Sequence, residues 1–204
     1  MTKELDLYDF KILDELDKNS RGSASEIARK VRLSKVAVNR RIRKLQEKGI
    51  IKAFIAQVDY RKLGYNNCRV FYKLQNLSSE DEEKFYSYLI SHKLIAYIGR
   101  MDGNFDTFLA VFYKNNEQLD EMLHEINSKF GKNIKERVIL PIINAQYFGR
   151  RYLIKAKELK YIKPIIRQKP EKLIELDELD HKILQTLNQN ARIPTIDLAN
   201  KLGI

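Results

Sequence analysis

The sequence of 204 residues contains one cysteine, no tryptophan and only four prolines. The single cysteine, Cys68, excludes a disulfide within the chain, and the absence of Cys/His clusters argues against a structural zinc site. Apolar and polar residues alternate around Cys68, which predicts a buried strand residue and not a nucleophile. No apolar run approaches about 18 residues, and the first ten residues do not resemble a signal peptide. We therefore expect a cytoplasmic protein that makes no contact with a membrane.

The sequence also has few groups suited to catalysis. Its three histidines, His92, His124 and His181, fall on different predicted elements without partner spacing, so each is expected to be an ordinary helix residue. No glycine-rich phosphate loop and no nucleophile motif occurs. We therefore predict no catalytic residue, no metal ligand and no cofactor, and we do not expect an enzyme.

What the sequence does have is positive charge, a formal net charge of +11 that is concentrated in two blocks. Residues 29–52 contain ten lysines and arginines against one acid, and residues 150–172 contain nine against two. A net charge alone could serve solubility, but a local block favours a polyanionic partner.

Three short helices are predicted around the first block. Asp6 can cap the first helix, whose apolar stripe is Tyr8, Ile12, Leu13 and Leu16. The run Ser23–Glu26 fits a capping box that opens a second helix. Ser34 and Gly49 can bound a third helix whose apolar stripe is Val38, Ile42 and Leu45. A tight turn between the last two helices makes a helix-turn-helix, and the strand-like run Ile50–Val58 would serve as its wing.

The outer face of the third helix is the predicted site for double-stranded DNA. Arginine can bond guanine, asparagine can pair with adenine, and an exposed valine can touch a thymine methyl group. The alternative interpretation is a solvated basic helix without a ligand. The residues predicted to contact DNA are Ser34, Lys35, Val36, Asn39, Arg40, Arg41, Arg43 and Lys44.

The middle of the chain changes to a mixed pattern in the order βαββαβ, the ferredoxin-like arrangement. Such an antiparallel sheet leaves one face to be covered, often by another copy of the chain. The predicted elements are a strand at Cys68–Leu74, a helix capped by Ser79, strands at Leu94–Met101 and Phe105–Tyr113, a helix from about Asn116 to Gly131, and a strand at Ile134–Ile143.

The segment Asp102–Asp106 permits two interpretations. Asp102-Gly103 is a typical hairpin dipeptide, so the segment could be a turn and nothing more. An acid and an amide on a turn could also hold the amine and carboxylate of a small ligand. The candidate effector-binding residues are Gly103, Asn104, Phe105 and Asp106.

Residues 176–204 repeat residues 5–33 without a gap, with eleven identities in twenty-nine positions. The repeat contains the cap and the apolar stripe but not the basic third helix, so it could not read DNA itself. We expect this half-motif either to dock on a neighbour or to be disordered. The basic segment 150–172 between the copies is interpreted as a linker, with some helix near Arg151–Lys160.

These residues together resemble the Lrp/AsnC family of feast/famine transcription regulators. The resemblance spans about residues 5–142. It depends on Leu5-Asp6-x-x-Asp9-x-x-Ile12-Leu13, Ala28-x-x-Val31-x-Leu33-Ser34, Arg40-Arg41-Ile42-x-x-Leu45-x-x-x-Gly49-Ile50-Ile51, Asp59-x-x-x-Leu63-Gly64-Tyr65 and Gly103-x-Phe105-Asp106. It implies sheet-to-sheet pairing of subunits and an effector, commonly an amino acid, bound between subunits near Gly103–Asp106. The second copy departs from the family pattern and indicates a tandem of two regulator modules, cut short.

We therefore predict an α+β protein with four parts. They are a winged helix-turn-helix DNA-binding domain at 1–64, a ferredoxin-like effector and oligomerisation domain at 65–149, a linker at 150–172 and an incomplete repeat at 173–204. The predicted function is effector-controlled, sequence-specific regulation of transcription by a homodimer or a higher even-numbered oligomer. The alternatives are a sirohaem-type tetrapyrrole decarboxylase with the same two-domain plan, and an architectural protein that coats DNA without sequence preference.

Overall fold

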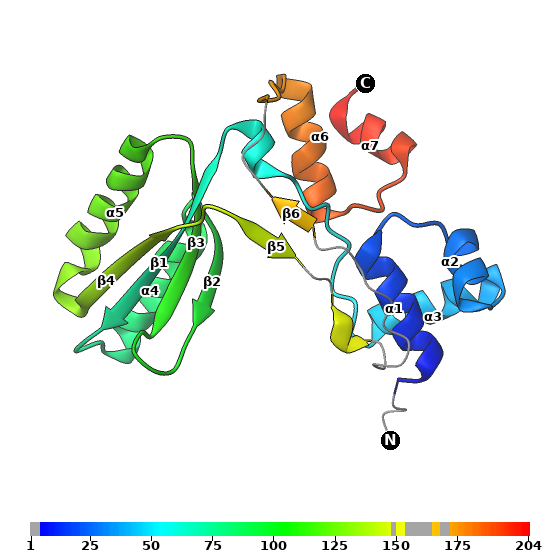
Figure 1. Cartoon of the computed structure of the whole chain (residues 1–204), viewed down its shortest axis with the longest axis horizontal. Helices are drawn as coiled ribbons and strands as arrows, with labels where there is room; N and C mark the ends of the chain where they lie inside the picture. The colour runs from blue at the N-terminus through cyan, green and yellow to red at the C-terminus, as the bar shows by residue number, and fades with distance from the viewer. Residues whose placement is uncertain (1–4, 148–149, 154–164, 168–171) are drawn as a thin grey trace. The chain divides into compact units, whose positions relative to one another are not determined.

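The computed structural model describes residues 5–147, 150–153, 165–167 and 172–204, and these form two compact units (Figure 1). The first unit takes in the described residues up to Val58, from Gln146 to Ile166 and from Glu175 to Ile204. The second takes in Asp59–Ala145 and Arg167–Ile174. Residues far apart in the sequence therefore belong to the same unit.

Three helices open the first unit, and each begins at a side-chain cap that the sequence predicts. They are α1 (Leu7–Lys18), α2 (Ala24–Val31) and α3 (Lys35–Glu47). Asp6 accepts hydrogen bonds from the N–H groups of Tyr8 and Asp9, and Ser34 accepts one from the N–H of Ala37. Ser23 and Glu26 form the predicted capping box. These caps satisfy backbone donors that would otherwise have no partner, so they fix where each helix starts.

The core of the three helices contains most of the predicted apolar stripe, but Leu13 is only partly buried and Tyr8 is exposed. Ile12, Ile27 and Val38 bring α1, α2 and α3 together with almost no exposed surface. Tyr8 was predicted to be buried, and this is wrong because its side chain is 41% exposed. Its ring lies beside the guanidinium of Arg41, 5.6 Å from the ring centroid, and not in the core.

The segment after α3 does not form the predicted strand. Gly49 ends the helix with φ of +67°, and the N–H of Ile50 bonds to the carbonyl of Leu45, as expected of a C′ glycine. Residues 52–59, however, form no helix or strand in the structure. The carbonyl of Phe54 instead accepts a hydrogen bond from the N–H of Ala191, and the N–H of Ala56 donates to the carbonyl of Leu187.

The second unit has the predicted βαββαβ order and a four-stranded antiparallel sheet with strand order β2-β3-β1-β4 (Figure 1). Its cap at the first helix is Ser78 and not Ser79, because Ser78 accepts the hydrogen bond from the N–H of Asp81. A short 3₁₀ helix, η1, precedes the sheet and another, η2, follows α5. The bounds are η1 (Tyr60–Leu63), β1 (Asn66–Leu74), α4 (Ser79–Ser91), β2 (Ile95–Arg100), β3 (Thr107–Tyr113), α5 (Asn116–Phe130), η2 (Gly131–Asn133) and β4 (Ile134–Pro141).

One face of this sheet is packed and the other carries aromatic side chains. Cys68, Val70 and Tyr72 of β1 point into the core formed with α4 and α5. Burial raises the pKa of the Cys68 thiol to about 11, so it is a protonated core residue at neutral pH, as the alternation predicts. On the other face Phe71 stacks on Phe108, and Tyr97 is exposed.

The half-motif forms the two predicted helices, α6 (Glu178–Gln189) and α7 (Thr195–Leu202). Asp177 and Asp180 repeat the capping box of Asp6 and Asp9. The segment before it includes β5 (Ala145–Tyr147), a single 3₁₀ turn η3 (Arg151–Leu153) and β6 (Ile165–Arg167), which pairs with β5. The rest of the helix predicted near Arg151–Lys160 lies outside the described residues. Among the described residues, no helix is long and apolar enough to cross a membrane.

Candidate nucleic-acid interface

The outer face of α3 presents a set of polar and basic side chains that the rest of the unit leaves uncovered. Val38, Ile42 and Leu45 turn inward and fix the rotation of the helix. Val36, in the first turn, is 77% exposed, although an aliphatic side chain normally avoids water. The side chains exposed together with it are Lys35, Asn39, Arg40, Arg43 and Lys44.

These exposed side chains are available for a ligand. None of the basic ones, Lys35, Arg40, Arg43 or Lys44, forms an ion pair within the part of the chain that the structure describes. The hydroxyl oxygen of Ser34 accepts the hydrogen bond from the N–H of Ala37 that caps the helix.

The burial of Val38, Ile42 and Leu45 confirms the predicted orientation of α3.

Arg41 differs from its neighbours because it faces the first helix. Its guanidinium lies 2.8 Å from Asp6 and 2.7 Å from Asp9, and its side chain is only partly exposed. The same two carboxylates form the capping box of α1. Burial alone would raise the pKa of Asp6, but hydrogen bonds from the N–H of Asp9 and from Arg41 lower it below its usual value. Arg41 thus connects α3 to the start of α1.

Other acids of α1 are also engaged with basic residues of the scaffold. Glu15 contacts Lys30 of α2 at 2.5 Å and Lys18 at 2.9 Å. Burial would raise the pKa of Glu15, and the hydrogen bonds from these two lysines outweigh it and lower the pKa. Carboxylates that are paired inside the scaffold do not neutralise the basic face of α3.

The candidate effector loop, residues 101–106, connects β2 to β3. Gly103 has φ of +126°, a conformation that favours glycine, and both Gly103 and Asn104 are exposed. Phe105 packs against Phe71 with ring centroids 5.6 Å apart. The predicted turn is therefore present, but three of its four candidate residues, Gly103, Phe105 and Asp106, have structural contacts.

Asp106 fastens this loop to the neighbouring strand. One carboxylate oxygen accepts the N–H of Leu74 at 2.7 Å, and the other lies 3.0 Å from Nζ of Lys73. The hydrogen bond from Leu74 and the charge of Lys73 lower the pKa of Asp106. Lys73 also donates to the carbonyl of Gly103 at 3.2 Å. The loop is thus held in place from inside its own unit.

Two hollows of the second unit lie away from this loop. One is lined by Tyr60, Tyr65, Phe112 and Lys114 among others, and the second by Tyr86 and Ile90 of α4 together with residues of β2 that include Tyr97. Neither contains any of Gly103–Asp106.

Sequence reasoning missed two sets of contacts in the first unit. The spacing of Asp6, Asp9 and Arg41 along the chain gives no sign that they meet, although the pattern of two acids in a first turn was visible. The second set of contacts comes from two arginines at equivalent positions, Arg21 and Arg192, which join the two copies of the repeat. The repeat itself was the signal that could have pointed to them.

Comparison with known proteins identifies both copies of the repeat. Residues 5–52 match the model for a winged helix-turn-helix DNA-binding domain. Residues 176–204 match the model for an AsnC-type helix-turn-helix domain. The copy predicted to be incomplete therefore belongs to the same class of domain as the first.

The relative and the solved structures described next match between 60% and 68% of this chain. The HTH-type transcriptional regulator LrpC of Bacillus subtilis is 33% identical over 123 residues, which are 60% of this chain and 83% of LrpC. The structure of B. subtilis LrpC aligns with 68% of this chain and 94% of its own, with a TM-score of 0.59 and 30% identity. The regulator NMB0573 of Neisseria meningitidis, in complex with L-Met, aligns with 68% of this chain and 90% of its own, with a TM-score of 0.61 and 19% identity.

Proposed function

The chain belongs to the Lrp/AsnC family of transcription regulators, and from this premise we propose how it recognises DNA and responds to a ligand. In this proposal α3 lies in the major groove of double-stranded DNA. Its first two turns meet base edges, and its later basic residues meet phosphates. The observation that carries the proposal is the uncovered face of α3, where exposed basic side chains have no carboxylate partner among the described residues.

The residues divide by position along the helix. Asn39 and Arg40 lie within reach of base edges and can bond adenine or guanine, and Val36 offers an apolar contact to a thymine methyl group. Arg43 and Lys44 come one turn later, and with Lys35 they suit phosphate oxygens. Ser34 contributes its place at the helix N-terminus, where backbone N–H groups attract phosphate.

Arg41 has a different proposed role from its neighbours. It was predicted to contact DNA, and its guanidinium is directed to Asp6 and Asp9. We propose that it sets the angle of α3 against α1 and positions the residues that read DNA. A direct contact with phosphate stays a prediction that the salt dependence of binding can test.

An amino-acid effector is proposed to bind at the loop Gly103–Asp106, between two copies of the chain. Gly103 and Asn104 are exposed and can offer backbone and amide groups, while Asp106 keeps the loop fastened through Lys73 and Leu74. The L-Met complex of the Neisseria regulator supports an amino acid as the ligand class. Binding that bridges two copies would favour one assembly over another and so change DNA occupancy.

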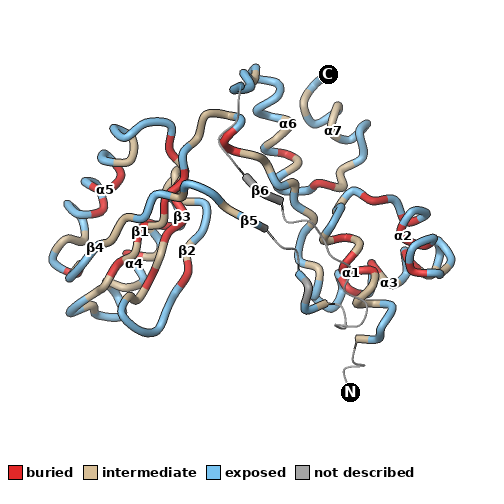
Figure 2. The backbone as a smooth tube through the Cα atoms, viewed as in Figure 1, coloured by how far each residue is buried: buried red, intermediate tan, exposed pale blue. Residues whose placement is uncertain are grey.

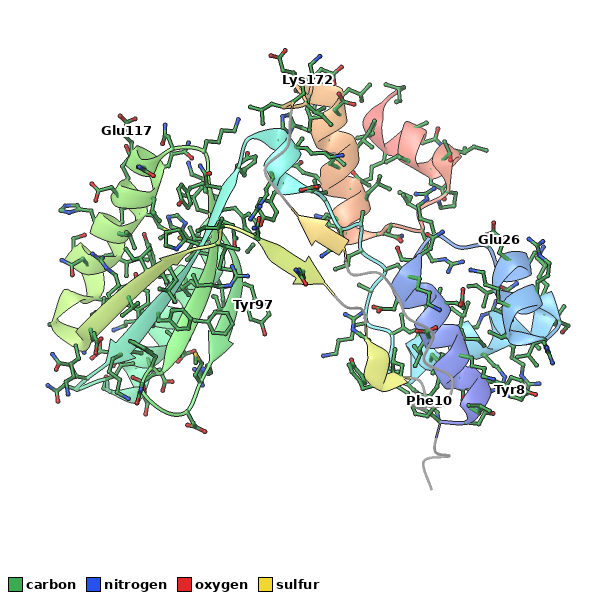
Figure 3. The ribbon with its side chains drawn as sticks, viewed as in Figure 1. Tyr8, Phe10, Glu26, Tyr97, Glu117 and Lys172 are labelled. Atoms are coloured by element: carbon green, nitrogen blue, oxygen red, sulfur yellow. The ribbon has the colours of Figure 1, made fainter. Side chains whose placement is uncertain are left out.

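Pairing of copies is proposed to use the exposed face of the sheet. The rings of Phe71, Phe108 and Tyr97 are in contact on this face. Leu140 of β4 is also exposed there, and it pairs in the sheet with Arg69 of β1. Figure 3 shows Tyr97 on the outside of β2. Apolar and aromatic surface of this kind is typical of an interface between subunits. A dimer would place two α3 helices on successive half-sites of a roughly palindromic operator.

Regulation of transcription fits the comparisons better than catalysis. The relatives named above are transcriptional regulators, and a non-enzymatic, cytoplasmic role is proposed from them. Selection of bound fragments from random DNA, with and without a panel of amino acids that includes L-methionine, tests the function. A recovered consensus sequence would support regulation, and recovery of unselected sequence would support non-specific coating of DNA.

A further inference from the structure

The half-motif at residues 176–204 packs against the helix-turn-helix at the start of the chain through two contacts that use equivalent arginines. Nη1 of Arg21 donates to the carbonyl of Ala191 at 2.8 Å. Nη2 of Arg192 donates to the carbonyl of Gly22 at 3.2 Å. Arg21 and Arg192 occupy the same position in the two copies. Each copy therefore uses the same arginine to hold the backbone of the other.

The turn that presents this arginine is also the same in both copies. Oδ1 of Asn19 accepts a hydrogen bond from the N–H of Arg21 at 3.0 Å, and Oδ1 of Asn190 accepts one from the N–H of Arg192 at 3.0 Å. The two acceptors are not equivalent, because Ala191 corresponds to Ser20 in the first copy and Gly22 corresponds to Ile193 in the second. The two turns are therefore joined by the same arginine through different neighbouring carbonyls.

The docked half-motif also forms backbone hydrogen bonds with Phe54 and Ala56, in the segment that follows α3. The N–H of Ala191 donates to the carbonyl of Phe54 at 2.7 Å, and the N–H of Ala56 donates to the carbonyl of Leu187 at 3.2 Å. The guanidinium of Arg192 lies 5.0 Å from the centroid of the Phe54 ring. Residues 52–59 form no strand, and these bonds give the carbonyl of Phe54 and the N–H of Ala56 their hydrogen-bond partners.

Burial gives a reason for the half-motif to dock. Ile12 and Ile27 of the first copy are covered by α3 and are almost fully buried. Their counterparts Ile183 and Leu198 are only partly buried, and α7 has no fully buried residue (Figure 2). Two short helices cannot build a sufficient core of their own. Ala191, at the contact, is by contrast 1% exposed.

We propose that residues 176–204 act as an internal docking module that binds the first helix-turn-helix of the same chain at the turn between α1 and α2 and at the segment after α3. The two Asn-x-Arg turns hold it there, and it fixes the segment 54–56. The contacts involve the turn between α1 and α2 and the segment after α3, so the DNA-reading side chains of α3 take no part in them. The module thus covers this surface and leaves the outer side chains of α3 exposed.

The test is hydrogen–deuterium exchange on the full chain, with Arg21→Ala, Arg192→Ala and the control Arg29→Ala, which removes an exposed arginine of α2. Each arginine acts on the other copy, so Arg21→Ala should speed exchange in peptides covering 186–193. Arg192→Ala should speed exchange in peptides covering 52–58. We expect about a tenfold change in each case, as for loss of one charge-assisted hydrogen bond. Equal exchange in these variants and in Arg29→Ala would overturn the proposal.

Dilution separates docking within a chain from exchange between chains. Protection of Ala56 and Ala191 should be the same at micromolar and nanomolar protein, because an intramolecular contact does not depend on concentration. Protection that is lost on dilution would mean that the half-motif docks on another copy, and would overturn the internal module. Ala191→Glu provides an independent variant, since a charge at this buried position should release the half-motif while the helix content of α1–α3 persists.

Discussion

The guanidinium of Arg41 lies 2.7 Å from a carboxylate oxygen of Asp9, and this ion pair joins α3 to the first helix of the domain. Asp6 lies at 2.8 Å from the same guanidinium, and the centroid of the Tyr8 ring lies 5.6 Å from it. Arg41 is therefore held by three residues of the first helix and its cap. Its side chain serves the scaffold although it belongs to the most basic segment of the sequence.

We predict that Arg41→Ala lowers the free energy of unfolding by about 1–2 kcal/mol, because it breaks a partly buried ion pair and removes packing on Tyr8. Urea unfolding followed by circular dichroism measures this. The matched control is Arg43→Ala, an exposed arginine of the same helix, which should change stability by less than about 0.5 kcal/mol. If both variants have the same stability, the scaffold role of Arg41 is wrong. Loss of about one unit from the salt slope of DNA binding in Arg41→Ala would show a phosphate contact instead.

Arg40→Ala should weaken binding to a selected DNA fragment by roughly 1–3 kcal/mol, because an exposed arginine in the second turn of α3 can bond guanine with two hydrogen bonds. Arg40→Lys keeps the charge but loses that geometry, so it should retain non-specific affinity and lose preference among sequences. Fluorescence anisotropy at fixed salt gives both values. Lys135→Ala, an exposed residue of β4, serves as the control and should bind as the wild type does. Identical sequence preference in Arg40→Lys and the wild type would assign Arg40 to phosphate.

Asp106 should make the stability of the sheet unit depend on pH in the acid range. Its pKa is lowered in the folded state by the N–H of Leu74 and by Lys73, so the ionised form stabilises the fold above the unfolded value of about 3.9. That contribution is lost as the pH falls through the folded value. Asp106→Asn lacks the charge, and its melting temperature should therefore fall less than that of the wild type between pH 6 and pH 3. Parallel curves for the two proteins would contradict the role of Asp106.

Leu140→Glu should weaken self-association at least tenfold, because it places a charge on the exposed apolar face of the sheet where pairing is proposed. Sedimentation equilibrium measures the dissociation constant. Ile90→Glu changes an equally apolar residue that is also exposed but belongs to α4, on the other face of the sheet. Weakening by Ile90→Glu alone would place the interface on the helical side of the unit.

The sequence predicted those features that depend on local chemistry. Asp6, Ser23 and Ser34 cap helices because a side-chain oxygen at that position satisfies a nearby N–H, and no distant residue is needed. The period-two pattern around Cys68 and the Asp102-Gly103 turn likewise placed the strands and the hairpin. The exposed face of α3 followed from the spacing of its apolar residues.

Features that depend on distant contacts could not be predicted in this way. The run Ile50–Val58 has the composition of a strand, but Phe54 and Ala56 bond to Ala191 and Leu187, more than 130 residues away. Tyr8 has helical spacing for the core, and yet Arg41 draws its ring to the surface. In both cases the conformation follows from a contact with a residue distant in the sequence and not from the local sequence pattern.

Hydroxyl-radical footprinting of a fragment selected from random DNA, at moderate salt, tests the central claim most directly. The claim is that the exposed face of α3 reads sequence. The account predicts discrete protected half-sites about one helical turn apart, which Arg40→Ala weakens and Lys135→Ala leaves unchanged. Continuous protection along the fragment, unaffected by Arg40→Ala, would contradict it.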